Sequence, residues 1–347
     1  MSAMLVINAG SGSIKTASFR VESEPEELSR AAADAATADA AVTEALRMAE
    51  RYGQQEPFAV IVHRIVHGGA AYATPTRLTP AVVHDLRQLI PLAPNHLPTA
   101  LALVEAFNAK YPASQPVACF DTGFHATLPA VARRLPIPAE YDEAGVRRYG
   151  FHGLSCASVI DALRRGADPG RADARLVIAH LGSGCSLTAT HYGRSVDTTM
   201  GFTPFGGVMM STRSGDLDPG VLAHLARTYG LDGDALEEVV SHRSGLLGVS
   251  TVSSDMRTLL DRTDANSRLA VEMFVYRVAK SVAELAVALG GIDGLVFTGG
   301  IGEHAAEIRQ RVCERLEWIR IPFVTVIPAD EELAMARAAF ALLKDLP

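Results

Sequence analysis

Two Gly-Ser-Gly turns are the part of this sequence best suited to bind an anion. Residues 5–18 read LVINAGSGSIKTAS and residues 177–190 read VIAHLGSGCSLTAT, so each turn joins two strand-like runs. Turns with glycine at two positions can direct several backbone N–H groups at one anion, as phosphate cradles do. A repeat near the start and the middle of a chain indicates two halves built on one plan. We therefore expect two phosphate loops that face each other across a cleft.

Three charged residues stand in or beside apolar runs, where a charge needs a partner or a ligand. Lys15 follows the first turn, and a role as phosphate-binding cation is favoured there over that of an ordinary exposed lysine. Arg64 lies inside the apolar run 58–69, so it must be paired in a salt bridge or face a cleft, and the sequence leaves both open. Asp121 follows a short strand predicted at 116–120, at the strand end where open α/β folds bind ligands.

The histidines give a weaker signal than the charged residues. His63 and His67 stand four residues apart, but the glutamate of the HExxH zinc motif is missing and the β-branched run around them favours a strand. A metal at this pair is therefore not expected. His152 lies between aromatic and glycine residues in RRYGFHG, and a lone histidine is more often structural than catalytic.

The elements that must position these residues follow from periodicity and turn signals. The segment 197–220 is dense in Gly, Thr, Pro and Asp and is predicted as loops near a site. Residues 294–304, GLVFTGGIGEH, are predicted as a strand, a third glycine turn and a helix that begins near Glu303. Helices are predicted at 22–52, 81–90, 99–109, 221–229, 234–241, 267–289 and 330–343, and further strands at 58–69 and 323–327.

The length, composition and charge of the chain limit the classes of protein to which it can belong. The chain has 347 residues, 48% of them hydrophobic, which suggests two domains with large cores. A net charge of −7 without basic runs argues against nucleic-acid binding. No apolar stretch is long enough to cross a bilayer, and no signal peptide is evident. The four cysteines show no metal or disulfide spacing, so we expect a protein of a reducing cytoplasm.

The ordered motifs of the chain resemble those of the acetate and propionate kinase family. The matching pieces are INAGSGSIK, HRIVHGG, FDTGFH, YGFHG, HLGSG, DTTMGFTPFGGVMMSTRSGDLDP, FTGGIGEH and DEEL. The resemblance implies an α/β fold of duplicated actin-like (ribonuclease H-like) domains, with mixed sheets flanked by helices and the active site in the interdomain cleft. It implies domains at residues 1–148 and 149–330, with a C-terminal helix at 331–347 that packs back on the first domain.

The resemblance also assigns roles to matching residues. It implies catalytic roles for Asp121, His152 and Arg213, and magnesium binding by Asn8 and Glu331. Substrate binding is implied for Arg64, which grips the carboxylate, and for Val66, Phe151 and Pro204, which form a small pocket for the acyl methyl group. The implied nucleotide contacts are Lys15, His180, Leu181, Gly182, Ser183, Gly184, Asp255, Met256, Arg257, Gly300, Ile301, Gly302, Glu303 and His304.

The implied reaction is reversible phosphoryl transfer from ATP to a short-chain carboxylate, most simply acetate, with Mg²⁺ or Mn²⁺. Because the acceptor is already ionised at neutral pH, the site needs cations and a metal more than a strong base. Asp121 is then expected to orient an arginine or metal-bound water. The partners implied are the carboxylate and the nucleotide, with no nucleic acid and no membrane, and the family implies a homodimer.

Departures from the family pattern leave alternatives open. Ser183 and His304 stand where the family usually has asparagine, which leaves the phosphoryl donor open, including pyrophosphate. Asn95 and Leu97, on either side of His96, are reversed from the usual order and leave the length of the acid open, so propionate or butyrate is an alternative. An alternative of another class is an actin-like ATPase that uses nucleotide only to switch conformation.

Overall fold

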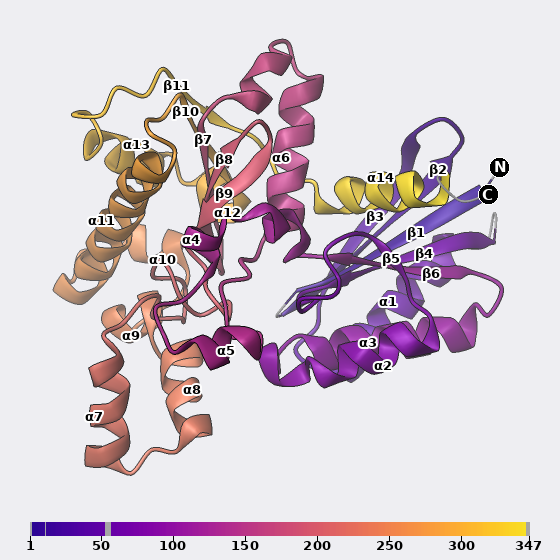
Figure 1. Ribbon diagram of the computed structural model, residues 1–347, viewed down its shortest axis with the longest axis horizontal. Coiled ribbons are helices and arrows are strands. Elements are labelled where there is room, and N and C mark those ends of the chain that lie inside the picture. The colour runs from indigo at the N-terminus through magenta and orange to yellow at the C-terminus, as the bar shows by residue number, and fades with distance from the viewer. Residues whose placement is uncertain (1, 11, 53–56, 345–347) are drawn as a thin grey trace. The chain divides into compact units, whose positions relative to one another are not determined.

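The computed structural model describes residues 2–10, 12–52 and 57–344 (Figure 1). Ser11 of the first turn and the last three residues of the predicted C-terminal helix lie outside the described residues. The chain divides into two compact units. Unit 1 comprises Met1–Ala126, Gly153–Ser158 and Asp330–Pro347, and unit 2 comprises Thr127–His152 and Val159–Ala329.

Unit 1 is built on a six-stranded mixed sheet with the order β3-β2-β1-β4-β6-β5. Strands β1 (Ser2–Ala9), β2 (Ser13–Val21) and β3 (Pro25–Asp34) form an antiparallel meander. Strand β4 (Phe58–Ile65) runs parallel to β1, and β6 (Gln115–Phe120) runs parallel to β4. The short β5 (Thr76–Arg77) pairs with β6 at the edge. The carboxyl ends of β1, β4 and β6 therefore lie at one edge of the sheet.

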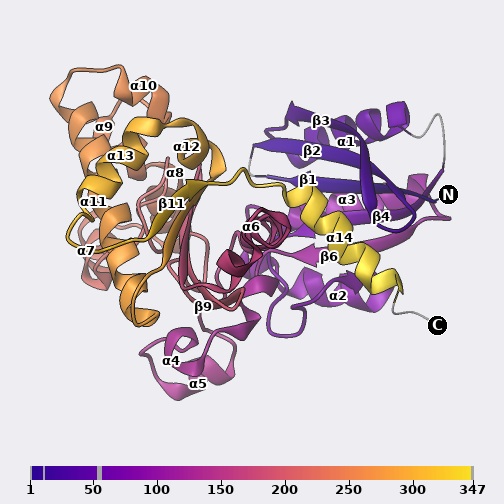
Figure 2. The same ribbon diagram turned by 90° about the horizontal axis from the view of Figure 1, so that it is seen from above.

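Side chains that alternate along β1 build two separate cores. Leu5 and Ile7 pack on one face with α1 (Ala38–Tyr52) and α3 (Leu97–Lys110). Met4 and Val6 pack on the other face with α14 (Glu331–Lys344). Figure 2 shows α14 lying across this sheet. This is the two-residue period expected of a strand that is buried on both faces. Helix α2 (Pro80–Gln88) completes the unit, and α6 (Gly153–Arg165) begins in it.

Unit 2 repeats the same plan with a five-stranded mixed sheet of order β11-β10-β7-β8-β9. Strands β7 (Leu176–Leu181), β8 (Cys185–His191) and β9 (Arg194–Thr198) are antiparallel, whereas β10 (Gly294–Thr298) runs parallel to β7 and β11 (Phe323–Val326). Its remaining helices are α4 (Ala130–Arg133), α5 (Ala139–Glu143), α7 (Pro219–Tyr229), α8 (Gly233–His242), α9 (Gly245–Ser250), α10 (Met256–Leu260), α11 (Ala265–Ala288), α12 (Gly299–His304) and α13 (Ala306–Glu314).

Most predicted elements are present, and two predictions are wrong in part. The single helix predicted at 22–52 is instead strand β3 followed by α1. Pairing with β2 and packing of alternate alanines, Ala31 and Ala33, against the core outweigh the helix propensity of alanine. The helix after β10 begins at Gly299 and not near Glu303. Gly299 has φ +76°, which lets the chain turn sharply out of the strand.

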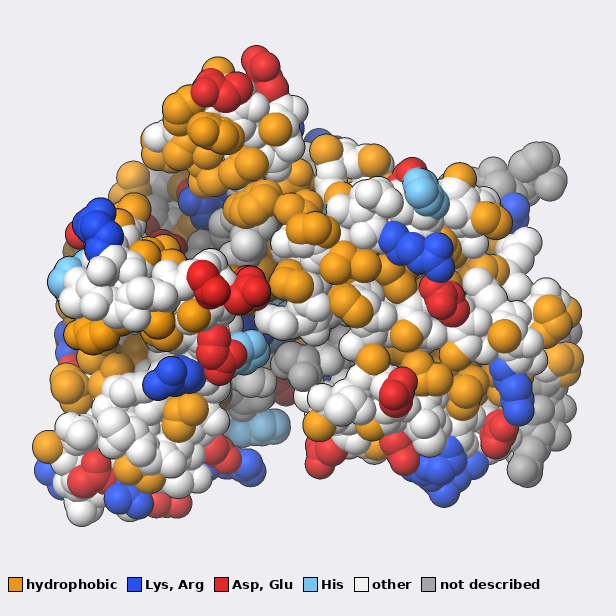
Figure 3. Space-filling model, turned by 90° about the horizontal axis from the view of Figure 1, so that it is seen from below, with side chains coloured by type: hydrophobic (Ala, Val, Ile, Leu, Met, Phe, Trp, Pro, Cys, Tyr) orange, Lys and Arg blue, Asp and Glu red, His pale blue; other side chains and the backbone are white. Residues whose placement is uncertain are grey.

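The surface of the molecule carries charges of both signs. On the face seen in Figure 3, Lys and Arg side chains lie singly or beside Asp and Glu, among hydrophobic side chains. No helix among the described residues is long and apolar enough to cross a membrane.

Candidate active site

In unit 1, Arg64 and Asp121 form a buried two-bond ion pair. Asp121 Oδ2 accepts from Arg64 Nε at 3.0 Å and from Nη2 at 2.5 Å, and the two side chains are 13% and 1% exposed. The residues meet because β4 and β6 are adjacent and parallel, with Arg64 in register with Cys119. Burial opposes the charge on Arg64, yet Asp121 and Glu331 outweigh it and raise the pKa of the guanidinium. Arg64 is therefore a fixed cation.

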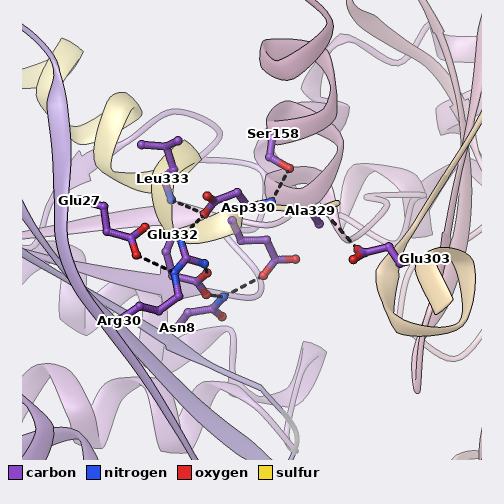
Figure 4. A network of polar contacts seen from close by, with 10 residues as sticks. Asn8, Glu27, Arg30, Ser158, Glu303, Ala329, Asp330, Glu332 and Leu333 are labelled. Atoms are coloured by element: carbon purple, nitrogen blue, oxygen red, sulfur yellow. Dashed lines mark hydrogen bonds and ion pairs between the residues drawn. The ribbon is translucent and has the colours of Figure 1, made fainter. Parts of the chain in front are cut away.

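Asn8 lies at the end of β1 between Arg64 and two carboxylates. Its Oδ1 accepts from Arg64 Nη1 at 3.1 Å. Its Nδ2 donates to Glu331 at 2.9 Å and to Glu332 at 2.6 Å, and Figure 4 shows Asn8 beside Glu332. The structure thus brings together Asn8, Arg64, Asp121 and Glu331, which the sequence had placed in four separate motifs. Glu332 was not predicted, and only its position beside Glu331 in DEEL could have pointed to it.

The donor set of this cluster fits a divalent metal held through few protein ligands. Asp121 Oδ1 is buried and accepts no hydrogen bond from any described residue. Carboxylate and amide oxygens such as those of Asp121, Glu331 and Asn8 are what Mg²⁺ prefers, usually one or two of them together with substrate phosphates and water. Within the described ranges, no group of three or more His, Cys, Asp and Glu side chains could hold a metal by itself. A metal shared with phosphates fits both observations.

Two further predicted residues of unit 1 lie near this cluster along the sheet. Lys15 on β2 is paired in register with Asn8, and residues directly opposite in an antiparallel pair share one face. The Lys15 side chain is exposed. Val66 follows β4 two residues after Arg64 and is buried.

In unit 2, His152 and Arg213 approach Gly184, and His180 stacks on His152. The rings of His152 and His180 stack with centroids 4.2 Å apart, and His152 Nδ1 lies 3.0 Å from Ser186 Oγ. A Cβ at Gly184 would lie 3.2 Å from His152 Nε2 and 3.3 Å from Arg213 Nη1. The absence of that Cβ lets both side chains approach the turn. His152 itself has a left-handed backbone, with φ 58°, at the start of α6.

The loop that carries Arg213 is held by backbone contacts. Arg213 Nη1 donates to the Pro204 carbonyl at 3.0 Å, and Ser211 N donates to the Ser183 carbonyl at 3.2 Å. The segment that leads to His152 is tied to β9, because Arg148 Nη1 donates to the Thr198 carbonyl at 2.5 Å. Sequence reasoning missed Arg148 and Ser186, whose roles depend on contacts that no motif encodes. Of the predicted acyl pocket, Phe151 and Pro204 belong to unit 2 and Val66 to unit 1.

A pocket of about 620 Å³ in unit 2 brings together most of the predicted nucleotide contacts. The predicted residues that line it are Gly182, Ser183, Asp255, Met256, Arg257, Gly300, Ile301 and His304. Lining residues that were not predicted are Ser211, Ser254, Leu260, Asp261 and Ala305, of which Ser254 and Ala305 are adjacent to a predicted residue. Predicted contacts of unit 2 that do not line it are His180, Leu181, Gly184, Gly302 and Glu303.

The residues outside the pocket shape its glycine turns. Glu303 Oε1 accepts from Gly299 N at 3.0 Å and from Ala329 N at 3.2 Å, so its carboxylate fixes the backbone at the start of α12. The second and third glycine turns lie close together, since a Cβ at Gly182 would be 3.8 Å from Gly300 N. A Cβ at Gly300 would meet no atom within 4 Å. Two exposed turns of this kind can present backbone N–H groups to a phosphate chain.

Comparison with known proteins gives matches over nearly the whole chain. The sequence model described as the Acetokinase family matches residues 32–334. The acetate kinase of Rhodopseudomonas palustris (strain TIE-1) is 39% identical, and the match covers 98% of each chain. The crystal structure of Porphyromonas gingivalis acetate kinase has a TM-score of 0.85 at 32% identity, covering 99% of this chain and 100% of that one. A propionate kinase from Francisella tularensis has a TM-score of 0.86 at 31% identity, covering 97% and 99%.

These likenesses and the two mixed sheets flanked by helices confirm the predicted fold class.

Proposed function

The chain belongs to the acetokinase family, as its motifs predicted, and from this premise we propose that it transfers the γ-phosphoryl group of ATP to acetate. The products are acetyl phosphate and ADP, and the reaction is reversible. The observation that carries the proposal is the approach of Arg213 and His152 to Gly184, because Gly184 follows Ser183 of the nucleotide pocket. Two donors are thereby held beside the place where the phosphates would lie.

The chemistry asks the chain for charge stabilisation and alignment. A carboxylate oxygen of acetate forms a bond to the γ-phosphorus, while the bond from that phosphorus to the bridging oxygen of ADP breaks. Arg213 and His152 stabilise the negative charge on the transferring group, and Arg64 binds the acetate carboxylate. Asp121 acts by fixing the guanidinium of Arg64, since Asp121 Oδ2 accepts hydrogen bonds from both Nε and Nη2 of Arg64. No general base is required, because acetate is ionised.

The proposal assigns the nucleotide and the metal to separate sets of residues. The nucleotide binds to the turns at Gly182–Ser183 and Gly300–Ile301 and to Asp255, Met256, Arg257 and His304. Lys15, in the first of the Gly-Ser-Gly repeats, contacts its phosphates. Asn8 and Glu331 would hold Mg²⁺, or Mn²⁺ in its place. When bound, the metal neutralises charge on the phosphate oxygens. The two turns are held in shape by neighbouring residues that do not line the pocket, namely His180, Leu181, Gly184, Gly302 and Glu303.

The preference for a carboxylic acid of a given chain length is proposed to depend on the residues of the acyl pocket. Val66, Phe151 and Pro204 present small or rigid apolar surfaces suited to a methyl group. The likeness to a propionate kinase makes propionate the alternative acceptor, and butyrate extends the series. Ser183 and His304 both line the nucleotide pocket, so they are the residues through which another phosphoryl donor would be selected.

The proposal extends to the organisation of the protein. We propose domains at residues 1–148 and 149–330, with the C-terminal helix on the first, a homodimer and a cytoplasmic location. The contacts of α14 with β1 and β6 in unit 1 support this placement of the helix. Exposed apolar side chains on α11, Leu269, Met273 and Tyr276, are of the type that dimer interfaces bury.

A hydroxylamine-trapping assay tests the function. The protein is incubated with Mg²⁺, hydroxylamine and either ATP or pyrophosphate, in parallel with acetate, propionate or butyrate, and the acyl hydroxamate is measured against a reaction without acid. We expect hydroxamate with ATP and acetate at the highest kcat/KM. Hydrolysis of ATP without hydroxamate from any acid would indicate the conformational ATPase instead. A higher kcat/KM with propionate or with pyrophosphate would select the corresponding alternative.

A further inference from the structure

Arg30 on β3 connects an edge strand of unit 1 to the cluster around Asn8. Its guanidinium contacts three carboxylates: Glu27 at 2.6 Å, Asp330 at 2.8 Å and Glu332 at 2.8 Å (Figure 4). Glu27 is on the same strand, whereas Asp330 and Glu332 stand at the start of α14. Arg30 thus joins β3 to the first turn of α14 by two ion pairs.

Glu332 is the inner member of this group, with a side chain only 3% exposed. Its two oxygens are divided between two partners: Oε2 accepts from Arg30 Nη1 at 2.8 Å, and Oε1 accepts from Asn8 Nδ2 at 2.6 Å. Removing one partner of a buried charge leaves the other without compensation. Without Arg30, the Glu332 carboxylate would keep, among the described residues, only its hydrogen bond from Asn8 and would be free to move toward water.

The orientation of the Asn8 amide depends on these charges. Oδ1 faces the Arg64 guanidinium and Nδ2 faces the carboxylates of Glu331 and Glu332. A reversed amide would set N–H groups against the guanidinium and oxygen against two carboxylates. The chain of contacts therefore runs from Arg30 through Glu332 and Asn8 to Arg64, which Asp121 holds on the other side.

We propose that Arg30 and Glu332 are positioning residues that set the Asn8 amide and, through it, the alignment of Arg64 and Glu331. The inference rests on the proposed function, in which Arg64 binds the carboxylate and Asn8 and Glu331 hold the metal. In that function, neither Arg30 nor Glu332 is assigned a contact with a reacting atom. Outer residues that orient metal ligands and binding groups commonly change affinity or activity by about 10- to 100-fold when replaced.

The β2–β3 hairpin that carries Arg30 also carries an exposed ion pair, which provides a matched control. Arg20 on β2 and Glu26 on β3 are 3.5 Å apart, with side chains 39% and 71% exposed. In the part of the chain that the structure describes, neither forms an ion pair or side-chain hydrogen bond with the cluster around Asn8. The variants Arg30→Gln, Arg30→Lys and Glu332→Gln are compared with Arg20→Gln. For each, kcat and KM for acetate and ATP are measured, together with the melting temperature. Binding of Mn²⁺·ADP, followed by water-proton relaxation, reports on the metal site without turnover.

We expect Arg30→Gln and Glu332→Gln to lower kcat by about 10- to 100-fold and to weaken the relaxation enhancement of Mn²⁺·ADP, while KM for ATP stays near the native value. Arg30→Lys should restore much of the loss, because it returns a cation to Glu332, and Arg20→Gln should behave as the native protein. Folded Arg30→Gln and Glu332→Gln proteins with native kcat and native relaxation would overturn the proposal.

A loss of activity that only follows the fraction of unfolded protein would overturn it too. If the native protein forms no acyl hydroxamate, the proposed function fails. The relaxation comparison among the variants still decides the positioning of the metal site in that case.

Discussion

At the scale of residues, the three side chains proposed to stabilise charge or bind the carboxylate each have a polar contact within the protein that fixes their position. Arg64 is held by Asp121, Arg213 by the carbonyl of Pro204, and His152 by Ser186. Donors that are fixed before the substrate arrives need little reorganisation in the transition state, which is the main source of electrostatic catalysis. The side chains of Arg64, Arg213 and His152 are therefore preorganised to stabilise a reaction between anions.

Replacement of Arg213 should remove transition-state stabilisation with little effect on stability. Arg213→Ala is expected to lower kcat by about 10²- to 10³-fold, or about 3–4 kcal/mol. Arg213→Lys should lie between Ala and the native residue, because lysine keeps the charge but loses the planar fork. The measurement is hydroxamate formation with saturating ATP and acetate. Arg227→Ala, on the exposed surface of α7, is the control, and an Arg213→Ala protein with the kcat of that control would contradict the assignment.

The sequence predicted the charged residues of the site better than it predicted their partners. Asn8, Arg64, Asp121 and Arg213 stand in motifs whose composition indicates their chemistry. Ser186, Arg148 and Arg30 are ordinary residues in strands and loops. Their contacts arise from strand register and tertiary pairing, which are not visible in a local pattern. Roles of that kind become apparent only when the strands are placed side by side.

At the scale of elements, strand β3 shows where local propensity misleads. Residues 22–52 are rich in alanine, and the helix predicted from that composition forms only in the second part, as α1. The first part pairs along its whole length with β2, and alternate alanines reach the core. Helix propensity is worth tenths of a kcal/mol per residue, so pairing of a whole strand outweighs it. The same strand carries Arg30 to α14.

The buried strand β4 should make the protein sensitive to acid. His63 and the following His67 are buried, and burial lowers the pKa of His63 to about 3 and that of His67 to about 4. In the unfolded chain a histidine binds a proton near pH 6.5. As pH falls from about 6.5 toward these values, the unfolded state takes up protons that the native state does not, so stability falls. At pH 5 each ring should cost about 2 kcal/mol relative to pH 7.

Urea unfolding of His63→Leu at pH 7 and pH 5 tests this. The loss of unfolding free energy between the two pH values should be smaller than in the native protein by about 2 kcal/mol, because the leucine does not titrate. His84→Gln, at an exposed position of α2, is the control and should keep the native loss. An equal loss in His63→Leu and the native protein would show that His63 is not the source of acid sensitivity.

At the scale of the whole molecule, the repeat in the sequence correctly indicated two sheets on one plan, but the copies are not equivalent in detail. The repeat aligns Asn8 with His180 and Lys15 with Leu187, yet Asn8 pairs with Lys15 whereas His180 pairs with Ser186. The second hairpin is one residue tighter, because Gly182 N donates to Gly184 O where Gly10 N donates to Ser13 O. Turn closure of this kind depends on backbone geometry, which residue identity does not determine.

Two pockets of unit 2 differ in what they offer a nucleotide, and this difference leads to a prediction for the whole chain. Unit 2 has the pocket of about 620 Å³ at the glycine turns, and a second pocket of about 650 Å³ between α10, α11 and α13. Only the first is lined by glycine turns that can bind phosphates. ADP should therefore slow amide hydrogen exchange at 182–183, 254–261 and 300–305, and leave 268–272 and 307–311 of the second pocket unchanged.

Gly300→Val sharpens the experiment, because the added side chain would enter open space at the pocket and not the core. The variant should keep the native melting temperature and lose the protection by ADP. Gly233→Ala in α8, where a Cβ also meets no atom within 4 Å, should keep both. Protection by ADP that persists at 182–183 and 300–305 in Gly300→Val would show that the nucleotide does not bind against Gly300. Protection that appears at 268–272 and 307–311 would place the nucleotide in the second pocket. In either case the assignment of the nucleotide contacts to the first pocket would be wrong.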